Sequence, residues 1–168
     1  RAMTSEVKLE VVELETGQLS RAAALLASGM RDNPTHQKVF GPRPGRRLRR
    51  LEAFYGRAVP QLHRRGTILG AYRDGTLVGV LAVAGPGRCQ PSFLEALHLL
   101  PAFSYGAGPI VAVRLWQWMS AWARPDFREP HWHLGPAAVD AGLQNQGIGS
   151  ALLPRVCEWL DQRGATAY

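Results

Sequence analysis

The alternation of hydrophobic and polar positions predicts three strands in the first half of the chain. Residues 7–14, VKLEVVEL, alternate in part, as expected of a strand with one buried face. Two apolar runs, residues 67–73 and 77–84, flank the dipeptide Asp74-Gly75, which tolerates the positive φ angles of a tight turn. We therefore expect the second and third strands to pair antiparallel as a hairpin.

Helical periodicity predicts two helices between the first strand and the hairpin. In the first, apolar residues recur at the spacing of one helix face: Leu19, Ala22, Ala23, Leu26 and Met30. The second has apolar residues on one side from Leu48 to Leu62, and Pro60 is expected to end or kink it. Residues 32–45 between them contain three prolines and two glycines, which predicts a loop.

The second half of the chain has weaker signals and then a clear strand and helix. Residues 93–100 and 113–123 have a helical pattern, and the tryptophans there favour core packing over the lining of a pocket; they are Trp116, Trp118 and Trp122. Residues 131–139, HWHLGPAAV, predict a strand that is interrupted near Gly135 and Pro136.

A final helix is predicted over residues 150–164. Its apolar face repeats every four residues, at Ile148, Leu152, Val156 and Leu160. Pro154 lies inside this helix and removes one backbone hydrogen bond. Residues 165–168 begin another strand, at which the sequence stops.

Length and composition predict one ordinary globular domain. The chain has 168 residues, of which 46% are hydrophobic and 20% are charged. The sequence has no run long enough for a membrane span, no signal-peptide pattern, and too few cysteines for a disulfide framework. We expect a single domain over residues 4–168, with a cytoplasmic location and no membrane partner.

The net charge of +7 favours anionic ligands. Much of this charge is concentrated in one arginine cluster, formed by Arg43, Arg46, Arg47, Arg49 and Arg50. The cluster has no interleaved aromatic residues and no accompanying nucleic-acid motif. A solvated helix face is therefore favoured over a nucleic-acid site, and we expect no nucleic-acid partner.

The stretch LQNQGIGSALL, residues 143–153, joins the last predicted strand to the last helix. It does not fit three common glycine motifs. The Walker motif needs a lysine that is absent here, and the dinucleotide fingerprint needs a third glycine where Leu152 stands. The nucleophile elbow needs a glycine two residues after Ser150, which Leu152 again replaces.

The pattern that remains is Gln-x-x-Gly-x-Gly, formed by Gln144, Gly147 and Gly149. Such a loop leads into a helix N-terminus, where unpaired N–H groups and the positive end of the helix dipole can bind a pyrophosphate. Glycine lets the phosphate approach the backbone because no Cβ atom stands in the way. An interrupted strand before the loop also leaves backbone groups that an amide-bearing ligand could pair with.

The stretch VDAGLQNQGIGSALL resembles the acetyl-CoA-binding motif of the GNAT acetyltransferases. The resemblance implies an α/β GNAT fold with a mixed central sheet flanked by helices, and acetyl-CoA as cosubstrate. It implies that strand residues hold the pantetheine arm, namely Ala137, Ala138 and Val139. It also implies that the loop beginning at Gln144 holds the pyrophosphate through the N–H groups of Asn145, Gln146, Gly147, Ile148, Gly149 and Ser150.

A closer likeness is to the puromycin N-acetyltransferase-like bacterial members, through the spacing of Asn33-Pro34, Phe40-Gly41-Pro42, Arg47 and Phe54-Tyr55. It implies transfer of acetyl to a primary amine of a small molecule, such as a xenobiotic or antibiotic. By the same resemblance Phe40, Phe54 and Tyr55 border the acceptor, although core packing is an equal alternative for each. Family members continue with further strands and a helix, which this chain lacks, so we expect the natural protein to be longer.

The chemistry implied by the resemblance is direct attack of the amine on the thioester. An oxyanion donor is then expected among the backbone N–H groups of residues 137–139. His133 is the candidate base and shares a strand face with His131, although a structural role is the alternative. A third metal ligand is not found at a useful spacing, so no metal site is expected. A non-catalytic acyl-CoA-binding module, peptide acetylation and a homodimer are left open.

Overall fold

The computed structural model describes residues 9–88, 92, 94–95, 97, 108–123, 131–165 and 167. The predicted helix over residues 93–100 therefore lies largely outside the described residues. The strands are β1 (Leu9–Glu13), β2 (Gly66–Arg73), β3 (Thr76–Ala84) and β4 (His133–Val139). The helices are α1 (Leu19–Gly29), α2 (Pro34–Phe40), α3 (Pro44–Arg65), α5 (Gly108–Ala123) and α6 (Ile148–Asp161), with short 3₁₀ turns at Thr16–Gln18 and Ala141–Leu143.

The four strands form one antiparallel sheet in the order β1-β2-β3-β4. β2 and β3 form the predicted hairpin, whose turn residues Asp74 and Gly75 have φ angles of 50° and 73°. Just before β4, Trp132 makes an isolated parallel bridge with Ala167. The sheet was predicted to be mixed, and its four strands are antiparallel. The parallel pairing is the bridge from Trp132 to Ala167, which lies in the segment predicted to begin another strand.

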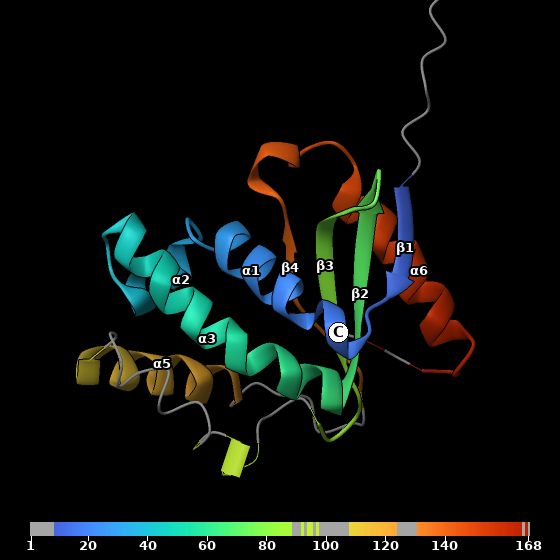
Figure 1. Ribbon diagram of the computed structural model, residues 1–168. Coiled ribbons are helices and arrows are strands. Elements are labelled where there is room, and N and C mark those ends of the chain that lie inside the picture. The colour runs from blue at the N-terminus through green and yellow to red at the C-terminus, as the bar shows by residue number, and fades with distance from the viewer. Residues whose placement is uncertain are drawn as a thin grey trace, which may run out of the picture.

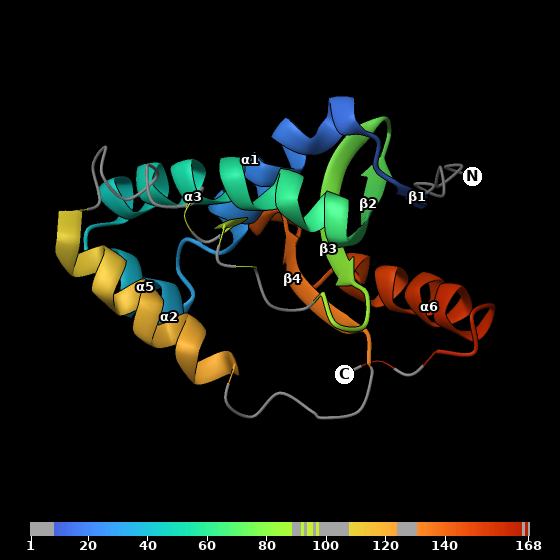
Figure 2. The same ribbon diagram turned by 90° about the horizontal axis from the view of Figure 1, so that it is seen from below.

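Helices cover both faces of this sheet. Figures 1 and 2 show α1 and α3 on one face and α6 on the other. Because successive side chains of a strand point to opposite faces, Ile68 and Val80 join the hydrophobic core under α1 and α3. Leu69 and Leu81 join the core under α6. The hairpin is therefore buried on both faces, which explains its nearly continuous apolar sequence.

The helix α6 confirms the predicted periodicity, since its four apolar residues are at most 6% exposed: Ile148, Leu152, Val156 and Leu160. Pro154 lies inside this helix, as predicted. The helix α3 likewise contains Pro60 but continues to Arg65, so of the two predicted effects of Pro60, an end or a kink, the end is wrong. Five more residues follow the proline in α3, and Val59 beside it is fully buried in the core.

The prediction of an uninterrupted loop over residues 32–45 is wrong, because α2 lies within it. Asn33 caps this helix through its side-chain oxygen, which accepts the N–H groups of Thr35 at 2.9 Å and His36 at 3.4 Å. Pro34 occupies the first turn, where no hydrogen bond is lost. The proline that suggested a loop therefore marks a helix start.

The predicted helix over residues 113–123 is confirmed as part of α5, which packs against α2. Its tryptophans differ in environment. Trp118 packs against the core, as expected, whereas Trp116 is 68% exposed and does not. The side chain of Trp122 lies outside the described part of the chain. Among the described helices, none is long and apolar enough to cross a membrane.

Candidate functional site

The loop between β4 and α6 begins with a turn that Asp140 organises. The Asp140 N–H donates to the Val78 carbonyl of β3 at 2.9 Å, which ties the end of β4 to the sheet. The Asp140 side chain accepts the Gly142 N–H at 2.9 Å. The backbone carbonyl of Asp140 accepts the Leu143 N–H at the same distance, 2.9 Å. This turn directs the chain across the end of the sheet toward the N-terminus of α6.

The next residues form an exposed loop in front of α6. Asn145 and Gly147 have left-handed φ angles of 61° and 80°. Gly147 is the N-cap residue and no side chain caps the helix, while its carbonyl accepts the first helical bond from Ala151 at 3.0 Å. The first-turn N–H groups are therefore oriented outward from a left-handed turn, as in backbone sites that bind anions.

The two motif glycines leave space beside this loop for different reasons. A Cβ atom on Gly147 would meet nothing within 4 Å, so the positive φ angle is what requires glycine there. A Cβ atom on Gly149 would touch only Val139 Cγ2, at 3.9 Å. Ile148 between them is 1% exposed, so it can offer a ligand only its backbone. The other predicted loop residues are exposed: Gln144, Asn145, Gln146 and Ser150.

The predicted interruption of β4 is confirmed as a β-bulge. Between the pairs Val83–Leu134 and Leu81–Ala137, β4 advances by one residue more than β3 does. Gly135 lies in this bulge with a φ angle of 139°. The bulge changes the direction of the strand and leaves the backbone around it without regular ladder partners.

Beyond the bulge, the outer side of β4 offers backbone donors. The Asp140 N–H points to β3, and N–H groups alternate between the two sides of an antiparallel strand. The Val139 N–H therefore points away from β3, as does that of Ala137 two residues earlier. Ala138 differs, because its side chain packs under α1, where a Cβ atom on Gly29 would approach it to 2.9 Å. Ala138 thus fixes the distance between α1 and β4.

The two histidines of the predicted catalytic strand are both held within the protein. His131 is 6% exposed and His133 is half-buried at the start of β4. The His133 ring lies beside the bulge, with Nε2 at 3.7 Å from the position of a Cβ atom on Gly135. His133 therefore borders the same strand interruption as the candidate cofactor groups. A group of three possible metal ligands is not found in the described ranges.

The structure corrects the expectation that Phe40, Phe54 and Tyr55 border an acceptor. Their side chains are 1%, 8% and 2% exposed. They pack against one another, with ring centroids 5.6 Å apart for Phe40–Phe54 and 5.1 Å for Phe54–Tyr55. The equal alternative, core packing, is what this structure shows, because buried rings present no surface to a ligand.

A buried histidine completes this aromatic cluster. His36 stacks on Phe40 and Tyr55, and it makes a T-shaped contact with Trp118 of α5, with ring centroids 5.5 Å apart. Its Nε2 atom lies 3.1 Å from the Tyr55 hydroxyl. Burial lowers the pKa of His36 to about 4 and raises the pKa of Tyr55 above its ordinary value. His36 is therefore neutral at physiological pH and holds α2 against α3.

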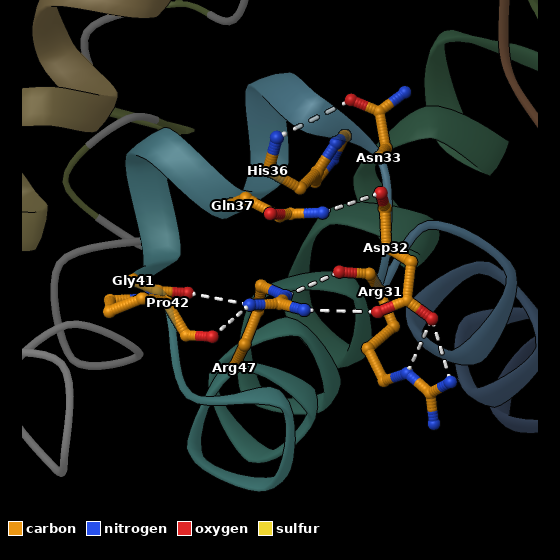
Figure 3. A network of polar contacts seen from close by, with 8 residues as sticks. All are labelled: Arg31, Asp32, Asn33, His36, Gln37, Gly41, Pro42 and Arg47. Carbon is orange, nitrogen blue, oxygen red and sulfur yellow. Dashed lines mark hydrogen bonds and ion pairs between the residues drawn. The ribbon is translucent and has the colours of Figure 1, made fainter.

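The arginine cluster is only partly the solvated face that the sequence predicts. Arg47 is 2% exposed and lies at the centre of a polar network (Figure 3). Its guanidinium donates to the carbonyls of Arg31, Gly41 at 2.8 Å and Pro42 at 2.9 Å, and to the Asp32 carboxylate at 3.0 Å. One side chain thus joins both ends of the α2 segment to α3.

Asp32 completes this network from the surface side. Hydrogen bonds from Arg31 at 2.7 Å and from Arg47 hold the pKa of the Asp32 carboxyl below its usual range, with Arg31 the larger influence. Sequence reasoning missed both His36 and Arg47 as structural centres. The capping pair Asn33-Pro34 could have revealed the helix on which His36 lies, but a run of arginines gives no sign of which one is buried.

The comparisons with known proteins agree with this geometry. The sequence profile of the Acetyltransferase (GNAT) family matches residues 32–168. A structure of histone acetyltransferase HPA2 and related acetyltransferase from Corynebacterium glutamicum superposes with a TM-score of 0.65 at 22% identity, covering 88% of this chain and 68% of that protein. No curated protein matches the chain.

Two further solved structures share the fold. The Drosophila melanogaster polyamine N-acetyltransferase has a TM-score of 0.57 at 16% identity, covering 94% of this chain and 73% of that protein. A GNAT family acetyltransferase from Brucella melitensis in complex with acetyl-CoA has a TM-score of 0.53 at 12% identity, covering 94% and 71%. Acetyl-CoA is the acyl donor of this family. The match of the family profile to residues 32–168 establishes that the chain belongs to the Acetyltransferase (GNAT) family.

Proposed function

We propose that the chain transfers an acetyl group from acetyl-CoA to a primary amine of a small molecule. The observation that carries this proposal is the loop before α6, in which the left-handed residues Asn145 and Gly147 open an uncapped helix N-terminus. Such a site suits a doubly charged pyrophosphate better than a neutral ligand. Membership of an acetyl-CoA-dependent family supports this choice of anion.

The cofactor groups would divide between the loop and the strand. The N–H groups of the loop from Asn145 to Ser150, which follows Gln144, would hold the pyrophosphate. The pantetheine arm would pair with the outer side of β4, where Ala137 and Val139 direct their N–H groups. Ala138 would contribute through its backbone only, because its side chain is buried under α1. The anionic pyrophosphate would thus bind at the helix N-terminus, and the pantetheine arm with its amide groups would bind along the strand.

The reaction that we propose has no covalent enzyme intermediate. The lone pair of the neutral amine attacks the thioester carbonyl carbon, so that a C–N bond forms and negative charge develops on the oxygen. The oxygen charge would be stabilised by the Val139 N–H on the outer side of β4. The C–S bond then breaks, CoA leaves as the thiolate, and the amine proton passes to a base.

His133 is the base that we propose from the described residues. It is half-buried at the start of β4 and lies beside the bulge, on the same strand as the backbone donors. A histidine has a pKa suited to proton transfer near neutral pH. The proton would pass from the reacting nitrogen to His133 directly or through one bridging water molecule, as is common for such a base.

The acceptor that we propose is a small amine. The polyamine N-acetyltransferase and an agmatine N-acetyltransferase, with TM-scores of 0.57 and 0.55, are named for amine acceptors of low molecular weight. Aminated xenobiotics and antibiotics, as the motif spacing suggests, belong in the same test.

The experiment is to measure free CoA thiol from acetyl-CoA with a panel of amines: agmatine, spermidine, puromycin, an aminoglycoside and a lysine peptide. The expected result is release of CoA that requires one or more of the small amines and an acetylated product of the matching mass. Release of CoA with the lysine peptide alone would indicate that the acceptor is a protein. Binding of acetyl-CoA without turnover on any amine would favour a non-catalytic acyl-CoA-binding module.

A further inference from the structure

Arg73, the last residue of β2, reaches across to the glycine loop. Its Nη1 atom donates to the Gln146 side-chain oxygen at 2.7 Å, although the two residues are 73 positions apart in the sequence. Gln146 directly precedes Gly147, the N-cap of α6. This hydrogen bond therefore connects the β2–β3 hairpin to the backbone that would hold the pyrophosphate.

The base of Arg73 is held firmly. β2 lies between β1 and β3, and Arg73 pairs with Leu9 on one side and with Thr76 on the other. The adjoining turn through Asp74 and Gly75 has the two positive φ angles of a tight hairpin. The guanidinium thus extends from the end of a central strand, and its hydrogen bond to Gln146 places it beside the loop before α6.

The positive charge of Arg73 lies near the N-terminus of α6, where the helix dipole favours a negative charge. α6 has no acidic residue in its first turn and no side-chain cap, so its positive end is not compensated locally. The Arg73 Nε atom is buried and has no hydrogen-bond partner among the described residues. A buried donor without a partner is costly. A cation at a helix N-terminus is unfavourable unless an anion joins it.

We propose that Arg73 is a specificity-determining residue for phosphate-bearing acyl donors, oriented over the glycine loop by Gln146. This inference rests on the proposed function, because it places the CoA pyrophosphate in the same loop. The guanidinium supplies a positive charge that the backbone N–H groups lack. It therefore strengthens binding of the charged part of the cofactor and leaves the pantetheine contacts along β4 unchanged.

The experiment is calorimetric titration of CoA into the wild-type chain and into Arg73→Gln, Arg73→Lys and Arg155→Gln. Each titration is done at about 50 mM and about 300 mM NaCl, because salt weakens charge–charge attraction but not packing. Arg155 is the matched control, since it is an exposed arginine two turns into α6 that pairs with Glu158, and its replacement changes the net charge equally. Thermal unfolding verifies that each variant is folded.

The expected result is that Arg73→Gln weakens CoA binding about tenfold at the lower salt concentration and less at the higher one. Arg73→Lys should retain most of the salt dependence because it keeps the charge. Arg155→Gln should stay within about twofold of the wild type.

Two results would overturn the inference alone: Arg73→Gln binding CoA like the wild type, or losing affinity equally at both salt concentrations, which would indicate loosening of the loop. Failure of the wild type to bind CoA at all would overturn the proposed function and the inference together.

Discussion

Two connections of the molecule contrast in how their polar groups are satisfied. In the connection from α1 to α3, buried Arg47 donates four hydrogen bonds, and His36 and Asn33 add side-chain contacts of their own. In the connection from β4 to α6, most side chains are exposed and the helix has no side-chain cap. The first connection satisfies its backbone groups internally, whereas the second leaves them available.

This difference separates structure from function in a chain rich in arginine. Four of the five N–H donors of the buried Arg47 guanidinium bind three carbonyl groups and the Asp32 carboxylate, so Arg47 holds the fold. A loop of left-handed residues in front of an uncapped helix leaves N–H groups without partners. An anion that accepts hydrogen bonds from them would stabilise this loop. The ligand site is therefore expected where the protein's own contacts are fewest.

The largest effect on stability is expected from Arg47→Met. Removing the guanidinium leaves three carbonyl groups without this donor and Asp32 with Arg31 alone, which should lower the free energy of unfolding by about 3 kcal/mol or more. Arg46→Met, at an exposed neighbour, should change it by less than about 0.5 kcal/mol. Urea unfolding of both variants measures the difference. Equal stability of the two would remove Arg47 from the centre of this connection.

A smaller, pH-dependent effect is expected from His36→Phe. The folded pKa of about 4 lies below the ordinary value of 6.5, so between these values the unfolded chain binds a proton that the folded protein does not. His36 therefore costs stability as the pH falls from 6.5 to 4, by up to about 3 kcal/mol at the acid end. Between pH 7 and about pH 4.5, the variant should lose less stability than the wild type. Parallel losses in both proteins would contradict the burial of a neutral histidine.

The smallest effect on stability is expected at Gly149. A Cβ atom there makes only an ordinary contact with Val139, and alanine favours a helix, so Gly149→Ala should change the free energy of unfolding by less than about 1 kcal/mol. Gly149→Val should also stay folded but weaken acetyl-CoA binding at least about tenfold, because a branched side chain fills the approach to the loop. Thermal unfolding and calorimetry of both variants test this, and unchanged binding by the valine variant would place the ligand elsewhere.

The sequence predicts the sheet well because its signals are local. Asp74-Gly75 between two apolar runs suffices for the hairpin, and four apolar residues at helical spacing suffice for α6. The Gln-x-x-Gly-x-Gly pattern likewise predicts a loop before a helix, which the positive φ angle of Gly147 confirms. Each of these features depends on residues within one turn or one strand pair.

The remainder depends on contacts between distant residues, which periodicity does not encode. Prolines at the start of the short helix α2 and beyond its end led to the prediction of a loop. Arg47 is buried because Asp32 and the carbonyls of the preceding loop bind it. The hydrogen bond between Arg73 and Gln146 joins elements on either side of α5 and β4 in the sequence. Side chains of these types are exposed by default, so only the fold reveals the exceptions.

The most direct test of the account is titration of acetyl-CoA into the wild type and Gly147→Val. A β-branched residue disfavours the left-handed conformation of Gly147, and its side chain would enter space that no protein atom fills within 4 Å of the Cβ position. We expect a dissociation constant on the order of micromolar for the wild type. We expect no detectable binding by the variant, which should still unfold cooperatively. Equal binding by the two proteins, or none by the wild type, would contradict the assignment of this loop to the cofactor.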